Sequence, residues 1–254
     1  MIPFVRRQRI LGFLGENDIG YLPDFIALFD NVSESTIRRD LKALEAEGQV
    51  QVLHGGAATL SDGTSSSYDM PVEKKRYLNI EGKRAIAAHA ASLVSDGEVI
   101  YVDSGTTTFS MIEFLKEKQI KVVTSNTSVL TELRDAKFQC VILGGDVTET
   151  LGSVTGPITD NLLRGMYFDK AFLGATGYSE VSGLSTPDFR EANKKQIVAA
   201  NSEEVYVLVD SSKSGKRSLC KFLDLPDAII ITDEETEILR LHASYVVAPS
   251  GLTL

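Results

Sequence analysis

The chain has 254 residues, 43% of them hydrophobic and 24% charged, and a formal net charge of −9 at pH 7. This is ordinary for a globular protein, and the length accommodates a small domain plus a medium one. An acidic chain repels polyanions on average, so any nucleic-acid binding requires a local patch. No apolar run reaches the roughly 20 residues that span a bilayer, and no secretory signal is evident, which predicts a cytoplasmic protein.

The N-terminal 60 residues predict a small domain built mainly of helices. Residues 6–15 are amphipathic, and residues 22–29 form a second short helix with Pro23 in its first turn. Ser33 is positioned to cap a third helix. In that helix, one apolar stripe faces inward, made by Ile37, Leu41 and Leu44.

A hairpin is expected after this third helix. The sequence VQVL followed by HGGAATL alternates and turns like two short strands. Helix, helix, turn, helix and hairpin is the order of a winged helix-turn-helix, which we assign to residues 1–60. The polar stretch SDGTSSS then indicates a linker over residues 61–72, followed by a second domain over residues 73–254.

The second domain predicts an α/β fold with a mostly parallel sheet. Apolar strands that we expect to be buried alternate with helical stretches, and each ends in small or polar residues. In open α/β sheets, ligands bind outside the carboxyl ends of the strands. The predicted strands are EVIYVD (98–103), KVVTSN (121–126), CVILGG (140–145), KAFLGA (170–175), EVYVLVD (204–210), AIIITD (228–233) and SYVVA (244–248).

Arg38 and Arg39 on the third helix have two possible roles. Arginines near the start of a helix in the major groove read guanine bases. They can equally form weak surface pairs with carboxylates, such as those of Glu34, Asp40 or Glu45. Residues 1–60 carry six basic and eight acidic side chains. Periodicity and charge therefore leave both roles open.

Two strand-end loops of the second domain suggest an anion site. The stretch DSGTTT (103–108) lies between a strand and a helical stretch, so its amides and hydroxyls suit a phosphate. A simple capped turn is the commoner role of such a loop. Lys213, in the loop 210–215, adds an ammonium at the same sheet edge. Together the loops favour a small anionic ligand, whereas the three histidines lack the spacing of a metal site.

The stretch VSESTIRRDLKALEAEGQVQVLHGGA resembles the DeoR family of bacterial transcription regulators, whose motif runs VSxxTIRRDLxxLExxG and ends in HGGA. This resemblance implies that the third helix and the wing bind double-stranded operator DNA. The wing carries Gln51 and Val52 where family members commonly have arginines. We therefore expect modest affinity per domain and a homodimer or homotetramer. The implied DNA-binding residues are Ser33, Ser35, Thr36, Arg38, Arg39, Lys42, His54 and Gly55.

Residues 73–250 resemble the DeoR effector domain, itself similar to ribose-5-phosphate isomerase, in which a GTGST-like loop and a lysine in a DxSK loop hold the substrate phosphate. The resemblance implies a phosphorylated sugar as effector and no cofactor. The implied effector-binding residues are Asp103, Ser104, Gly105, Thr106, Thr107, Thr108, Ser125, Asn126, Gly144, Gly145, Thr176, Glu191, Asp210 and Lys213.

The sequence argues against isomerase activity. That reaction needs carboxylates at the ligand, which the isomerases place in a DGADE loop, whereas the corresponding FLGATG (172–177) has none. The resemblance also makes Glu191 a candidate remnant of the isomerase pattern, but a lone carboxylate without the acidic loop and its neighbouring lysine is a poor catalyst. Glu191 could equally pair with Lys194 or Lys195 on its own helix. We therefore expect a repressor of a carbohydrate operon that a sugar phosphate modulates. An isomerase-like enzyme fused to a DNA-binding head, and a DNA-binding scaffold without a ligand, are the alternatives.

Overall fold

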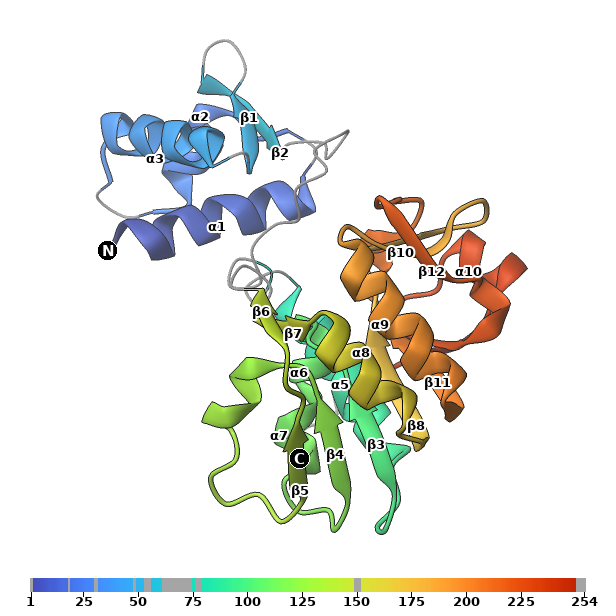
Figure 1. Ribbon diagram of the computed structural model, residues 1–254. Coiled ribbons are helices and arrows are strands. Elements are labelled where there is room, and N and C mark those ends of the chain that lie inside the picture. Colours follow the sequence, from blue (N-terminus) through green and yellow to red (C-terminus); the bar gives the residue numbers. More distant parts are fainter. Residues whose placement is uncertain are drawn as a thin grey trace. The chain divides into compact units, whose positions relative to one another are not determined.

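The chain divides into two compact units, residues 1–66 and 67–254. The computed structural model describes residues 2–17, 19–29, 32–47, 49–52, 56–60, 75, 79–148 and 152–249. The predicted linker and the predicted wing residues His54 and Gly55 lie outside these ranges. We call the first unit the head and the second the sensor, and we describe each by itself (Figure 1).

The head is a winged helix-turn-helix, as predicted. In its described residues, three helices pack around one apolar core, and two strands pair antiparallel with Val50 opposite Leu60. The predicted inward stripe of the third helix is confirmed, since Ile37, Leu41 and Leu44 are almost fully buried. The elements are α1 (Pro3–Glu16), α2 (Leu22–Ala27), α3 (Glu34–Ala46), β1 (Val50–Val52) and β2 (Ala58–Leu60).

The sensor is built on a seven-stranded sheet in the order β14-β13-β11-β8-β3-β4-β5, with every neighbouring pair parallel. This confirms the predicted α/β class. The strands are β3 (Val99–Val102), β4 (Lys121–Thr124), β5 (Gln139–Ile142), β8 (Phe168–Gly174), β11 (Ser202–Leu208), β13 (Ile229–Thr232) and β14 (Ser244–Val247).

Helices cover both faces of this sheet (Figure 1). Strand residues alternate between two apolar clusters, so Ile100 and Val102 pack on one face while Tyr101 packs on the other. The first face carries α5 (Ile80–Ser92), α6 (Thr106–Phe109) and α7 (Met111–Leu115). The second face carries α8 (Pro157–Arg164), α9 (Phe189–Ala200) and α10 (Glu237–His242).

Two of the strands differ from the expectation of burial. β5 and β14 are the two edges of the sheet, so each has one strand neighbour and their residues are largely exposed or half-buried. Smaller sheets flank the main one. They are the hairpin β6 (Asp146–Thr148) with β7 (Ser153–Thr155), and the antiparallel sheet of β9 (Gly177–Ser179), β10 (Gly183–Thr186) and β12 (Cys220–Leu223).

The chain order of the sheet reverses between β3 and β8. From β3 the chain continues to β4 and β5 on one side, whereas β8, β11, β13 and β14 lie on the other. Ligands of open α/β folds bind at such a switch point, outside the carboxyl ends of the strands. No helix of the described residues is long and apolar enough to cross a membrane.

Candidate functional site

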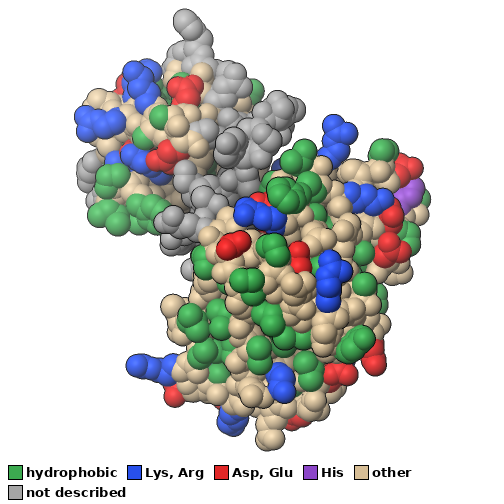
Figure 2. Space-filling view, in the orientation of Figure 1, with side chains coloured by type: hydrophobic (Ala, Val, Ile, Leu, Met, Phe, Trp, Pro, Cys, Tyr) green, Lys and Arg blue, Asp and Glu red, His purple; other side chains and the backbone are tan. Residues whose placement is uncertain are grey.

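One face of α3 presents polar side chains to solvent. Ser33 begins the helix, and its Oγ accepts a hydrogen bond of 3.3 Å from the backbone N–H of Thr36. Ser35, Arg39 and Lys42 are exposed. Lys and Arg side chains lie beside acidic ones on the head (Figure 2), as its mixed charge count suggests. The helix thus offers hydroxyls and cations at its start, where groove-reading helices contact bases.

Arg38 forms the surface pair that the sequence left open. Its Nε donates to Glu34 Oε1 at 2.8 Å, one helical turn away, and both side chains are about half exposed. Such pairs contribute only a few tenths of a kcal/mol, so DNA can displace this one readily. Gly56 of the wing lies close by, because a Cβ built there would stand 2.8 Å from Arg38 Nη1. The wing and α3 therefore meet at Arg38.

Asp40 has a different role from its neighbours in the RRDL motif. Its carboxylate is buried, and Arg6 donates to it from Nε at 2.5 Å and from Nη2 at 3.1 Å. Arg7 Nε adds a contact at 3.5 Å. Asp40 therefore joins α3 to α1 and does not pair with Arg38 or Arg39. The sequence contained a signal for this, since Asp40 lies three residues after Ile37 on the inward stripe.

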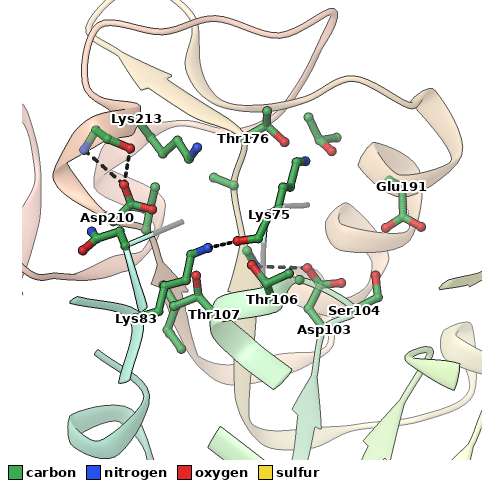
Figure 3. A pocket seen from close by; sticks show the side chains of 18 of the residues that line it. Lys75, Lys83, Asp103, Ser104, Thr106, Thr107, Thr176, Glu191, Asp210 and Lys213 are labelled. Atoms are coloured by element: carbon green, nitrogen blue, oxygen red, sulfur yellow. Dashed lines mark hydrogen bonds between the residues drawn. The ribbon is translucent and has the colours of Figure 1, made fainter. Parts of the chain in front are cut away.

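The sensor has a pocket of about 120 Å³ at the carboxyl ends of its central strands, β3, β8 and β11 (Figure 3). It is smaller than the roughly 300–1,000 Å³ of pockets for drug-sized ligands, which indicates a small ligand. Nine of the predicted effector-binding residues line it. They are Asp103, Ser104, Gly105, Thr106, Thr107, Thr176, Glu191, Asp210 and Lys213.

The other five predicted effector-binding residues do not line this pocket, and their role stays a prediction. Thr108 Oγ1 donates to the carbonyls of Asp103 and Gly105, so it closes the turn below the pocket. Ser125 and Asn126 are buried after β4, where Asn126 Oδ1 accepts from the N–H of Ser128. The pair Gly144 and Gly145 precedes the β6–β7 hairpin, with the Gly144 carbonyl accepting from Thr159.

Lysines and one carboxylate form one side of the pocket. Lys213 lies there with Lys83 from α5, and Lys75 from the stretch before α5. The pKa of Lys83 is lowered to about 8, chiefly by burial; Asp210 opposes this shift, and the charges of Lys213 and Lys75 add to it. Sequence reasoning missed Lys83 and Lys75. For Lys83 the signal was a lysine on the inner face of a predicted helix.

A buried ion pair forms the other side. Asp103 follows β3 and pairs with Lys195 of α9, and its Oδ2 also accepts from the N–H of Gly174 at 3.0 Å. Burial acts to raise the pKa of Asp103, but Lys195 and Lys194 hold it below its ordinary value. Among the described residues, nothing donates to the buried Oδ1 of Asp103. The pocket therefore contains a charged acceptor that a ligand hydroxyl could satisfy.

Glu191 lines the pocket and also belongs to a buried network behind it. Its Oε1 accepts from Ser153 Oγ at 2.7 Å and from Lys194 Nζ at 3.0 Å. Lys194 is fully buried and donates as well to Ser125 Oγ at 2.9 Å. The expected pairing of Glu191 with Lys194 is thus present. Glu191 is not a lone carboxylate, however, because Asp103 and Lys195 line the same pocket.

A winged helix-turn-helix head and an α/β sensor with a small polar pocket together define a ligand-responsive DNA-binding regulator. The DeoR-like helix-turn-helix domain model matches residues 6–62, and the DeoR C terminal sensor domain model matches residues 78–234. The chain belongs to the DeoR family of transcription regulators, which confirms the resemblance seen in the sequence.

Relatives along nearly the whole chain carry regulator names. The chain is 38% identical over 234 residues to the uncharacterized HTH-type transcriptional regulator FruR of Bacillus subtilis (strain 168), covering 92% of each. It is 32% identical to the HTH-type transcriptional regulator GlpR of Haloferax volcanii, covering 92% of this chain and 91% of that one. It is also 32% identical to a lactose phosphotransferase system repressor of Staphylococcus epidermidis, covering 85% and 87%.

Among solved structures, ribose 5-phosphate isomerase A of Methanocaldococcus jannaschii is similar over 52% of this chain and 53% of that one, with 24% identity and a TM-score of 0.38. The translation initiation factor eIF-2B of Pyrococcus horikoshii OT3 is similar over 59% and 54%, with 19% identity and a TM-score of 0.43. By its family matches the chain is a DNA-binding transcription regulator, and the relatives reported above are named as transcription regulators.

Proposed function

We propose that this regulator represses a carbohydrate operon from the cytoplasm, and that a phosphorylated sugar in the sensor pocket modulates its affinity for operator DNA. The observation that carries the proposal is the division of the pocket into two chemically different sides. Lys83 and Lys213 lie on one side, and on the other lies the buried acceptor Asp103 Oδ1, to which no described residue donates. A sugar phosphate carries an anion and hydroxyl donors in one small molecule.

The phosphate group of the effector would bind on the lysine side of the pocket. The ammonium groups of Lys75, Lys83 and Lys213 lie near the carboxylate of Asp210 and leave positive charge that a phosphate would neutralise. Burial is the main cause of the lowered pKa of Lys83, and the charges of Lys213 and Lys75 add to it. The hydroxyls of Ser104, Thr106 and Ser212 are available to the same pocket. A sugar hydroxyl would then donate to Asp103 Oδ1. The pocket would bind an analogue without that hydroxyl more weakly, because Oδ1 would be left without a donor.

A thermal-shift panel tests this proposal. Sugar phosphates, the matching unphosphorylated sugars and inorganic phosphate are compared on the full chain. A ligand at 100 times its dissociation constant adds about 2.7 kcal/mol to the free energy of unfolding. Lys213→Ala should remove the shift but spare DNA binding, whereas Lys121→Ala, at the opposite end of the sheet, should retain it. No shift with any sugar phosphate would favour the scaffold without a ligand.

Operator binding is the second half of the test. Gel shifts on the chain's own upstream region compare the parent with Arg38→Ala and Arg39→Ala. If α3 reads DNA, both variants bind more weakly while the head stays folded. Equal affinity would place the recognition surface elsewhere. A sugar phosphate from the panel should then change the parent's operator affinity about 5- to 150-fold, the usual range of allosteric coupling.

Binding without turnover is the expected chemistry at this pocket. The isomerase proton shuttle needs a carboxylate base whose pKa lies near the working pH, whereas lysines hold the pKa of Asp103 below its ordinary value. Glu191 is engaged by Lys194 and Ser153. Incubation of the chain at high concentration with ribose 5-phosphate or an amino-sugar phosphate should give no isomer. Measurable turnover would support the enzyme alternative.

A second copy of the chain is the partner that this function needs, because helix-turn-helix proteins read paired half-sites as dimers. On α8, Ile158 and Leu162 stand one turn apart and are 61% and 41% exposed. Hydrophobic side chains are frequent on this face of the sensor (Figure 2). We propose that this stripe takes part in a homodimer or homotetramer contact.

A further inference from the structure

The sensor pocket is partly built from the chain that arrives from the head. The helix-turn-helix match ends at residue 62 and the sensor match begins at residue 78. Lys75 lies between these limits and lines the pocket, together with Asn79 just before α5. The stretch that connects the two matched domains therefore contributes Lys75 to the place where a ligand would bind.

Two contacts hold Lys75 and the nearby Asn79 to the lysine side of the pocket. The ammonium of Lys83 donates to the backbone carbonyl of Lys75. Asn79 Nδ2 donates to Asp233 Oδ2 at 2.6 Å, and Asp233 Oδ1 accepts from the N–H of Ser211 at 2.7 Å. Lys213 belongs to the same short 3-10 turn as Ser211. Lys75 is thus joined to Lys83, and Asn79 is joined through Asp233 to the turn that contains Lys213.

The side chain of Lys75 also reaches into the pocket. Figure 3 shows it extending from its carbonyl beside Lys83 across the pocket toward Thr176. Its charge is close enough to Lys83 to lower the pKa of that residue. Without a ligand, the positive charges of Lys75, Lys83 and Lys213 oppose one another. An anion between them turns this repulsion into attraction.

We propose that Lys75 contacts the effector, and that through Lys75 the bound anion acts directly on the stretch of chain leading to the DNA-binding head. This inference rests on the proposed function of the pocket. A ligand shifts a conformational equilibrium only by its difference in affinity for the two states. Lys75 supplies such a difference, because its contact exists only in the state that places residue 75 in the pocket.

The size of the effect follows from the contact. A hydrogen bond to a charged group contributes roughly 10- to 150-fold in affinity. Because coupling is reciprocal, removal of the Lys75 contact should weaken effector binding and reduce the effector's influence on operator binding together. Lys83 and Lys213 would still bind the anion, so affinity falls but does not vanish.

Two measurements on the full chain test the inference. Thermal shift gives the affinity for the sugar phosphate that stabilises the parent most, with inorganic phosphate as a minimal anion. Fluorescence anisotropy on the chain's own upstream DNA gives operator affinity with and without saturating effector. In Lys75→Ala, effector affinity should fall about tenfold, operator affinity without effector should stay within about twofold of the parent, and the effector response should approach no change.

Two further variants sharpen the interpretation. Lys75→Arg keeps the charge and should restore most of the effector response. Lys121→Ala removes an exposed lysine at the start of β4, far along the sheet from the pocket, and should behave like the parent.

Three results would overturn the inference. An undiminished effector response in Lys75→Ala at saturation would show that Lys75 does not carry the signal. Loss of operator binding by Lys75→Ala without effector would show a structural role. No stabilisation of the parent by any sugar phosphate would reject the proposed function and this inference with it, whereas the first two results leave the proposed function standing.

Discussion

The buried ion pair between Asp40 and Arg6 predicts that a residue buried inside the head supports operator binding by keeping the head folded. In Asp40→Asn the carboxylate is lost, and Arg6, only 9% exposed at its side chain, keeps a charge without its main partner. Removal of one member of a buried pair costs about 3–5 kcal/mol. The remaining amide oxygen still accepts one hydrogen bond, so we expect a loss near 3 kcal/mol in the head.

Hydrogen exchange is the suitable assay, because a chain with two domains need not unfold in one step. Amides of α1 and α3 should exchange about 150-fold faster in Asp40→Asn, which corresponds to 3 kcal/mol, whereas sensor amides should be unchanged. Operator affinity should fall with the folded fraction of the head.

The matched control is the exposed pair between Arg38 and Glu34. Glu34→Gln removes a partner of an arginine in the same domain, but both side chains are about half exposed. Its cost should lie below about 0.5 kcal/mol. If Asp40→Asn changed exchange in α1 and α3 by less than about fivefold, or no more than the control, the reasoning from burial would be refuted.

Three further predictions concern the pocket, the surface and the wing. Lys83 is charged below its pKa of about 8 and neutral above it. The affinity of the pocket for an anion, measured by thermal shift, should therefore be constant near pH 7 and fall above pH 8. Lys83→Gln should abolish this pH dependence. The double variant Ile158→Asp with Leu162→Asp should have a lower oligomer mass by light scattering while its sensor stays folded. An unchanged mass would exclude these two residues of α8 as part of the contact between copies. Gly56 has φ +85°, where Cβ costs about 1–2 kcal/mol, so Gly56→Ala should weaken operator binding; parental affinity would contradict the approach of wing and α3.

Much of the fold followed from local patterns. The spacing of Ile37, Leu41 and Leu44 predicted the buried side of α3, and runs of β-branched residues predicted the strands of the parallel sheet. Periodicity reports such elements because burial repeats along the chain. It did not distinguish edge strands from central ones, since strand order depends on pairing between distant segments.

For the pocket, too, local patterns predicted some residues, whereas pairing between distant segments decided which of them meet. Asp103 and Asp210 were predictable because they follow apolar strands, and parallel strands end at one edge. That edge is wider than the pocket, so Ser125 and Gly144 share it but do not line the pocket. Only the order β11-β8-β3 decides which strand ends meet.

The sequence by itself determined the family, through the RRDL block and HGGA at their spacings, and with it the two-domain plan. Tertiary structure alone decided how the charged side chains combine. It paired Asp40 with Arg6, set Lys195 from α9 against Asp103, and brought Lys75 beside Lys83. These contacts join residues far apart in sequence or on different elements. Their partners are chosen by packing and by the cost of burying an unpaired charge, which no local pattern records.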